Sequence, residues 1–152
     1  MPQNDKEMAQ VYLNNDDLNN FKEMIKSEGF KIDTQYEKGR TLLHQACFLK
    51  KLNFIKLLIE NNSDINAQNI NGTTAIMYAK SNIIPSEYPI LDLLVEHGAK
   101  IYQKDKFERT VFDYIDNTEV KNYLFKLGQM ERFALIGAGA VVTKIDLDLL
   151  GG

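Results

Sequence analysis

The sequence contains an internal repeat of about 33 residues, and this repeat limits the fold more than any other feature. The segment 39–71 aligns with the segment 72–106. Three pairs of identical residues lie 33 positions apart: Gly39 and Gly72, Thr41 and Thr74, and Ala46 and Ala79. Farther along, the spacing becomes 36, because the second copy carries three extra residues around positions 83–85. A repeat of this length predicts a solenoid, in which each unit packs only on its neighbours.

Each unit has the apolar spacing of short amphipathic helices. In the segment 52–59, apolar residues recur at i, i+3, i+6 and i+7, and they are Leu52, Ile55, Leu58 and Ile59. This spacing places them on one face of a helix. Gly39 and Gly72 lie between the helical segments and favour tight or left-handed turns. Short helices of this kind bury their apolar faces only by stacking, so we expect one elongated core.

These residues resemble the repeat of the ankyrin family, which reads G-x-T-P-L-H-x-A-A and then L-L-x-x-G-A-D-V-N-A. The corresponding segments here are GRTLLHQAC, from Gly39, and LIENNSDINA, from Leu58. The resemblance implies an all-α ankyrin solenoid of about four helix-turn-helix repeats with projecting hairpin loops. We expect the array to span 1–128, with repeats at about 5–36, 37–69, 70–105 and 106–128 and with atypical outer repeats. An apolar tail at 129–152 would follow it.

The histidine position of the repeat indicates how firmly each unit is held. His44 and Cys47 lie three residues apart, as a nucleophile and its base would, but no third orienting group is evident. The family resemblance instead implies that His44 bonds backbone between adjacent repeats. The same position holds Met77 in the third repeat and Asp113 in the fourth. We therefore expect these two repeats to be less regular.

Composition and motifs argue against several classes of protein. The single cysteine excludes an intramolecular disulfide, and two histidines leave little for a metal site. The formal charge of -3 disfavours nucleic acid or an anionic membrane as the main partner. No P-loop, H-E-x-x-H or G-x-S-x-G motif occurs. The N-terminus has no apolar h-region, and the longest uncharged apolar run is too short to span a membrane. We expect a cytoplasmic, non-enzymatic protein without catalytic residues, cofactor or metal.

The ankyrin resemblance implies a protein-binding concave side, formed by the hairpin tips and the exposed face of each first helix. Transferred position by position, the predicted partner-binding residues are Tyr36, Lys38, Arg40, Gln45, Phe48, Leu49, Tyr78, Asn82, Lys104, Lys106, Phe107, Arg109 and Tyr114. Aromatic side chains beside long cations are typical of interface anchors, so we expect a partner with an acidic surface.

The chain also resembles small stand-alone bacterial and viral ankyrin proteins, some of which are inhibitors or immunity proteins. The resemblance implies an inhibitor or immunity-type protein that blocks a toxin or enzyme. An effector or adaptor that bridges host proteins is the alternative, and an enzyme with an unrecognised site is a third.

The repeat does not explain the run ALIGAGAVV at 134–142. Its glycines fail the dinucleotide pattern, because Val142 stands where a third glycine is due and too little chain follows for a βαβ unit. The glycines favour a bend into a strand or close packing against a neighbour. Residues 143–149 alternate between apolar and polar as a half-buried strand does. Three outcomes stay open. The tail folds back on the last repeat, it pairs through 134–150 with a partner or a second copy, or it is disordered.

Overall fold

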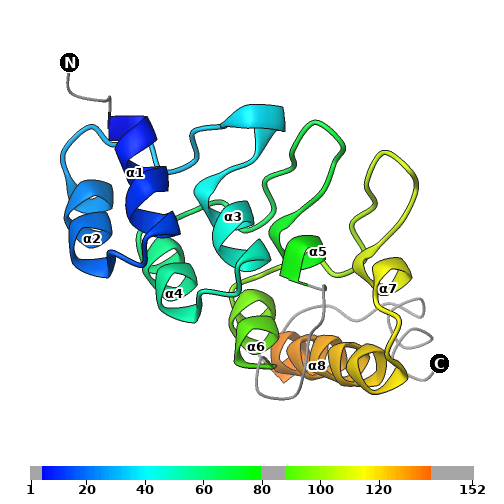
Figure 1. The fold of residues 1–152 in the computed structure, drawn as a ribbon. Helices are drawn as coiled ribbons and strands as arrows, with labels where there is room; N and C mark the ends of the chain where they lie inside the picture. The colour runs from blue at the N-terminus through cyan, green and yellow to red at the C-terminus, as the bar shows by residue number, and fades with distance from the viewer. Residues whose placement is uncertain (1–4, 80–87, 138–152) are drawn as a thin grey trace.

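The computed structural model describes residues 5–79 and 88–137, and these residues form an array of paired helices (Figure 1). In chain order, the elements are α1 (Asp5–Asn14), α2 (Leu18–Lys26), the 3-10 turn η1 (Glu37–Gly39), α3 (Leu42–Phe48), α4 (Leu52–Glu60), α5 (Ala75–Ala79), α6 (Tyr88–Glu96), α7 (Val111–Tyr114) and α8 (Thr118–Gly137). None of the helices in these ranges combines the length and the apolar character needed to cross a membrane.

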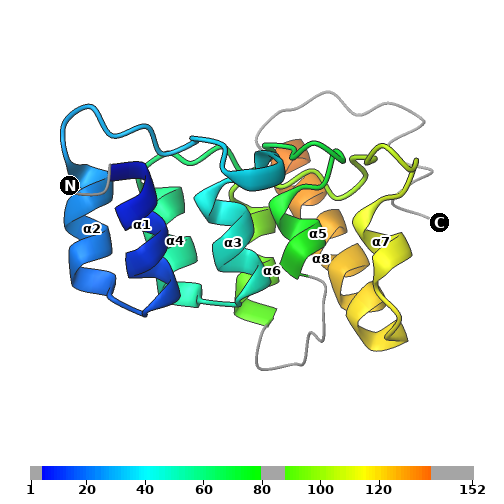
Figure 2. The same cartoon turned by 45° about the horizontal axis from the view of Figure 1, so that its top comes forward.

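The helices lie in two layers. The first helices α1, α3, α5 and α7 contact one another in sequence, and so do the second helices α2, α4, α6 and α8. Within each of the first three pairs, the two helices also contact each other. Figures 1 and 2 show the resulting elongated stack, with α1 and α2 at one end and α7 and α8 at the other. The predicted all-α solenoid is confirmed.

The core lies between the layers and continues from pair to pair. Ile55 and Leu58 of the predicted α4 stripe are fully buried, as is Leu94 at the matching place in α6. Between α2 and α4, the rings of Phe21 and Phe54 meet edge to face with centroids 5.0 Å apart. Each such side chain contributes about 1.5–3 kcal/mol relative to exposure to water. Apolar burial between neighbouring repeats therefore holds the array together.

The hairpin loops between the pairs project from one side of the helices and stack on one another (Figure 1). The first hairpin lies between α2 and α3, the second between α4 and α5, and the third between α6 and α7. The backbone N–H of Ile70 donates to the carbonyl of Lys38 at 3.0 Å. One repeat farther on, the N–H of Lys106 donates to the carbonyl of Asn71 at 2.9 Å. Each hairpin is thus held both by the helices that it connects and by a backbone hydrogen bond to the next hairpin.

Glycine makes this close stacking feasible. Gly39 and Gly72 have φ values of 76° and 75°, in the left-handed region. A Cβ atom added to Gly72 would lie 3.0 Å from the Cα of Asp105 in the next hairpin. A side chain at this position would therefore clash with backbone that has little room to move.

The second helices α2, α4 and α6 end with the same type of cap. After α2, α4 and α6 the chain passes through a residue with positive φ: Gly29 at 83°, Asn62 at 69° and Gly98 at 95°. An isoleucine follows each cap by three residues, at Ile32, Ile65 and Ile101. Ile65 and Ile101 are each only 8% exposed, so they anchor the exit loop in the core. A left-handed cap followed by an apolar contact is a common way to end a helix.

α8 departs from this pattern. Gly128 occupies the corresponding place, but it lies inside the helix, which continues to Gly137. Glu131 stands where the anchoring isoleucine is found in the other repeats, so the sequence has no apolar residue at this position to anchor an exit loop. The predicted boundary between array and tail at residue 128 thus falls within a continuous element.

The run ALIGAGAVV begins as helix. Residues 134–137 are the last described turn of α8, which reaches the first glycine of the run, so the predicted pairing segment starts as helix rather than as strand. The second glycine, Gly139, lies outside the described residues, and the expected bend stays a prediction. The remainder of the predicted 134–150 pairing segment, including the alternation at 143–149, lies outside the described residues.

The first helices differ in how their N-termini are bonded. In α3, the backbone N–H of Thr41 donates to His44 Nδ1 at 2.9 Å. Before α7, the N–H of Thr110 donates to Asp113 Oδ2 at 2.8 Å, so the carboxylate takes the place of the imidazole. α5 has Met77 at this position, and the buried hydroxyl of Thr74 makes no hydrogen bond within the described part of the chain. The expected irregularity therefore applies to the third repeat, whereas Asp113 restores the bond in the fourth.

This contrast gives a matched pair of substitutions. Thr74→Val is expected to leave the free energy of unfolding unchanged or to raise it by up to about 1 kcal/mol, because it removes a buried hydroxyl that has no partner. Thr41→Val is expected to lower it by about 1–2 kcal/mol, because the Thr41 hydroxyl accepts the backbone N–H of His44. Urea unfolding of both variants measures the difference. Equal effects at the two positions would contradict this assignment.

Candidate protein-binding face

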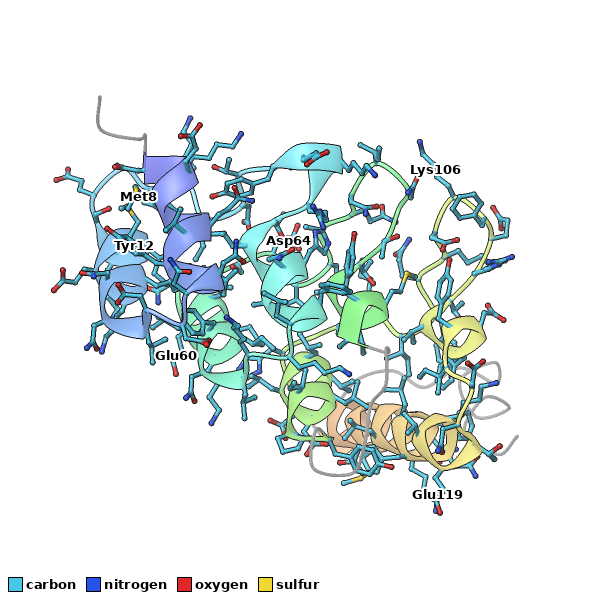
Figure 3. All side chains as sticks on the ribbon, in the orientation of Figure 1. Met8, Tyr12, Glu60, Asp64, Lys106 and Glu119 are labelled. Carbon is cyan, nitrogen blue, oxygen red and sulfur yellow. The ribbon has the colours of Figure 1, made fainter. Side chains whose placement is uncertain are left out.

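The predicted partner-binding residues lie on the hairpins and on the first-helix layer. Those of the hairpins are Tyr36, Lys38, Arg40, Lys104, Lys106, Phe107 and Arg109, and those of the first helices and their ends are Gln45, Phe48, Leu49, Tyr78 and Tyr114. Figure 3 shows Lys106 at the tip of the last hairpin, far from the helices. Asn82, the remaining member of the predicted set, lies outside the described residues.

The first-helix layer presents two apolar side chains and a tyrosine from two consecutive repeats. Phe48, at the end of α3, is 50% exposed, and Leu49 beside it is 38% exposed. The ring of Phe48 meets the ring of Tyr78 from α5 edge-on, with centroids 6.3 Å apart. The other neighbour of Tyr78 is the buried ring of His44, at 5.3 Å. We call Phe48, Leu49 and Tyr78 the inner-helix cluster.

The hairpin tips combine exposed apolar residues with cations. Phe107 is 62% exposed, and Ile70, which the sequence interpretation did not include, is 52% exposed. Lys104 pairs with Glu108 at 3.4 Å, but both side chains are largely in solvent, where such a pair contributes little. The tips therefore offer exposed positive charge beside apolar surface.

Tyr78 is held by the hairpin that precedes it. Asn69 Oδ1 accepts the backbone N–H groups of Asn71 and Thr73, at 2.8 and 2.9 Å, and this closes the second hairpin. The amide nitrogen of Asn69 then donates to the hydroxyl oxygen of Tyr78 at 2.8 Å. One asparagine thus fixes the hairpin and orients the aromatic side chain of the next helix.

The third hairpin repeats this arrangement with an acid. Asp105 Oδ1 accepts the N–H groups of Phe107 and Arg109, at 2.8 and 3.0 Å, and Tyr114 donates its hydroxyl to Oδ2. Burial by itself raises the pKa of Asp105, but the hydrogen bonds from Tyr114, Arg109 and Phe107 outweigh it and hold the pKa below its usual value. The guanidinium of Arg109 also lies over the Tyr114 ring, 5.9 Å from its centroid.

Sequence reasoning overlooked Asn69 and Asp105. A pattern that could have revealed them is present, since each lies nine residues before the tyrosine that it holds. The sequence interpretation concentrated on aromatic and cationic residues expected to be exposed, and it did not consider the polar residues that orient them.

Tyr36 joins the first hairpin to α1. Its hydroxyl donates to the carbonyl of Lys6 at 2.7 Å, and the Lys6 ammonium lies 5.1 Å from the ring centroid. Burial raises the pKa of Tyr36 to about 12. These contacts give Tyr36 a structural part in the array, and its membership of the binding face stays a prediction.

His44 and Cys47 have no arrangement for nucleophilic chemistry. His44 Nδ1 accepts from Thr41, so Nε2 carries the proton and donates to the carbonyl of Ala67 at 2.9 Å. Cys47 is fully buried, and burial raises the pKa of its thiol, which disfavours the reactive thiolate. In the described ranges, no three His, Cys, Asp or Glu side chains are grouped as metal ligands would be.

The structure is a stack of helix pairs with projecting hairpins, in which His44 is hydrogen-bonded to the backbone of Thr41 and Ala67. These features define the class of ankyrin-type arrays. The family model for ankyrin repeats (3 copies) matches residues 8–105. The chain belongs to the ankyrin repeat family. Ankyrin repeats are protein–protein interaction modules.

Individual relatives agree with this assignment. The chain is 30% identical over 124 residues to the ankyrin repeat protein BB_B28 of Borreliella burgdorferi, which covers 78% of the chain and 29% of the relative. It is 28% identical over 109 residues to the ankyrin repeat domain-containing protein OPG023 of cowpox virus, which covers 72% of the chain and 15% of the relative. The chain thus spans less than a third of the length of these relatives.

Among solved structures, the ankyrin repeat domain of Bcl-3 superposes with a TM-score of 0.68 and 23% identity, over 76% of the chain and 50% of that domain. At this identity the likeness shows the fold alone.

Proposed function

We propose that the chain is a binding module that blocks a partner protein by covering part of its surface, as an inhibitor or immunity-type protein does. The observation that carries this proposal is the inner-helix cluster, where Phe48 and Leu49 stay exposed although the core nearby is fully buried. Aromatic side chains held in a fixed position are frequent energetic anchors of protein interfaces.

The charge of the hairpins supports a partner with an acidic surface. Lys38, Lys106 and Arg109 are exposed on the hairpins, and Arg40 is partly exposed at the base of the first. Charges at the rim of an interface mainly accelerate association and select a partner of opposite sign. We therefore assign the cations to steering and the inner-helix cluster to affinity.

A capture experiment tests the proposal. Wild-type protein and the double variant Phe48→Ala/Leu49→Ala are used to capture a partner from source cells, with Tyr102→Ala as the control. Tyr102 is 45% exposed but lies in the loop after α6, stacked on Phe112. Loss of two anchors is expected to weaken the captured interaction at least about tenfold, whereas the control binds like the wild type.

The activity or toxicity of the captured protein is then measured with and without the chain. Inhibition by the wild type and not by the double variant is the expected result. Unchanged capture by the double variant would place the binding surface elsewhere, and capture without inhibition would favour an adaptor. Replacing Tyr36, Tyr78 and Tyr114 together by alanine would be a less suitable test, because Tyr36 and Tyr114 also make hydrogen bonds within the array.

A further inference from the structure

We propose that the inner-helix cluster receives a partner segment in which a carboxylate lies next to a large apolar side chain, with the Tyr78 hydroxyl donating to the carboxylate. This inference rests on the proposed function and adds to it the chemistry of the group that is recognised. Its basis is the direction of the hydrogen bonds around Tyr78.

The proton of the Tyr78 hydroxyl is available to a partner. Asn69 Oδ1 accepts two backbone N–H groups, so the nitrogen end of its amide must be the end that faces Tyr78. The nitrogen only donates, which makes the Tyr78 oxygen the acceptor of this bond. Within the part of the chain that the structure describes, the Tyr78 O–H has no bonded acceptor. A partly exposed donor beside an apolar ring therefore remains on the binding face.

At the equivalent position of the next repeat, the hydrogen bond of Tyr114 runs in the opposite direction. Its hydroxyl donates to Asp105, so the proton is used inside the array. The two tyrosines occupy the same position of consecutive repeats, but of the two only Tyr78 has a hydroxyl proton that a partner could accept. The acceptor site is thereby restricted to the part of the face where Phe48 and Leu49 also lie.

The local charge favours a carboxylate over a neutral acceptor. The positive charge of Arg40 acts on the His44 ring, which is the ring that Tyr78 packs against. Asp64 acts on that ring with the opposite sign, and its effect is smaller than that of Arg40. Arg40 is partly exposed, so a bound partner can approach its charge. A hydrogen bond to a carboxylate near a guanidinium is stronger than one to a neutral carbonyl.

The test uses a phage-displayed random peptide library selected on the wild-type chain. Enriched peptides are expected to share an aspartate or glutamate within two positions of a leucine, isoleucine or phenylalanine. The affinity of one synthetic peptide is then measured for wild type, Tyr78→Phe, Phe48→Ala and the control Tyr102→Phe. Tyr78→Phe is expected to lose about tenfold in affinity, as is usual for a hydrogen bond to a charged group. The control is expected to lose nothing.

Tyr78→Phe also removes the bond to Asn69 and could weaken binding by loosening the hairpin. A second peptide, in which the acid is replaced by its amide, distinguishes this effect from loss of the hydrogen bond to the peptide. The amide is expected to bind the wild type at least about tenfold more weakly. Tyr78→Phe is expected to distinguish the two peptides less than the wild type does, because it already lacks the hydrogen bond that the amide weakens. Additive losses, or enriched peptides without an acid, would overturn the inference and leave the proposed function standing.

Two other outcomes complete the test. Peptides whose binding is insensitive to Phe48→Ala would overturn both the inference and the assignment of the binding face. Failure to enrich any peptide would overturn the inference alone, since the capture experiment decides the function independently.

Discussion

Replacing His44 by alanine is expected to lower the free energy of unfolding by about 3 kcal/mol. The imidazole is 1% exposed, accepts the backbone N–H of Thr41 and donates to the carbonyl of Ala67. Alanine leaves both backbone groups without a partner and opens a cavity in the core. Because Ala67 lies in the loop that leads to the next repeat, the lost bond also loosens the connection between two repeats.

Urea unfolding measures this effect, and the second histidine provides the control. His97 is exposed at the end of α6, where its Nδ1 lies 2.8 Å from the carbonyl of Leu93. Its replacement by alanine is expected to change the free energy of unfolding by no more than about 0.5 kcal/mol. Similar effects of the two substitutions would show that His44 is not the central connection that its contacts indicate.

The contribution of His44 should also depend on pH. Burial and the nearby charge of Arg40 lower the pKa of His44, against the opposing effect of the bond to Ala67. Between the lower folded value and the ordinary value of about 6.5, the unfolded chain binds more protons. The stabilisation is therefore complete above about pH 6.5 and is lost as the pH falls through the folded pKa. Unfolding midpoints at pH 7.5 and pH 5 should show a smaller gap between wild type and His44→Ala at the lower pH.

The second large effect is expected at Asp105, where alanine should lower the free energy of unfolding by about 2–4 kcal/mol. Asp105 is 5% exposed, and its carboxylate accepts the N–H groups of Phe107 and Arg109 and the hydroxyl of Tyr114. All three donors lose their partner in the alanine variant. Thermal or urea unfolding, with binding of the selected peptide as a second readout, measures the loss.

Asn69 shows which substitution should be tolerated. It makes the same two backbone contacts and also holds a tyrosine, so Asp105→Asn is expected to cost less than about 1 kcal/mol at pH 7. The folded pKa of Asp105 lies below the unfolded value of about 3.9, so its stabilisation is present above that value and is lost as the pH falls through the folded pKa. Asp105→Asn should remove this acid dependence. A loss as large as that of alanine would contradict the equivalence of the two hairpins.

The repeat made the overall fold predictable, because spacing and apolar periodicity are properties of the sequence itself. The helix pairs and the turn at Gly72 follow from residues that recur at fixed intervals, whereas the structural part of His44 was implied by the ankyrin resemblance. The course of the chain after Gly128 did not follow, since a glycine at the expected cap position suggested an end. Whether a helix ends there depends on the isoleucine that follows, and Glu131 has replaced it.

The binding face was predictable only as a set of exposed residue types. Phe48 and Leu49 are exposed as expected, but the different directions of the hydrogen bonds at Tyr78 and Tyr114 depend on Asn69 and Asp105. Such differences arise from one side-chain atom, nitrogen in Asn69 and oxygen in Asp105, and no periodicity in the sequence reports them. The assignment of the complete set to a partner therefore remains a prediction.

The stacked hairpins have a consequence for the thermodynamics of recognition. Long surface loops ordinarily lose conformational freedom when a partner immobilises them, and this loss weakens binding. Here the bonds from Ile70 to Lys38 and from Lys106 to Asn71, with Gly72 packed against the next hairpin, have already removed that freedom during folding. We therefore expect the entropic penalty of association to fall mainly on long side chains such as Lys106, so that binding requires fewer anchors.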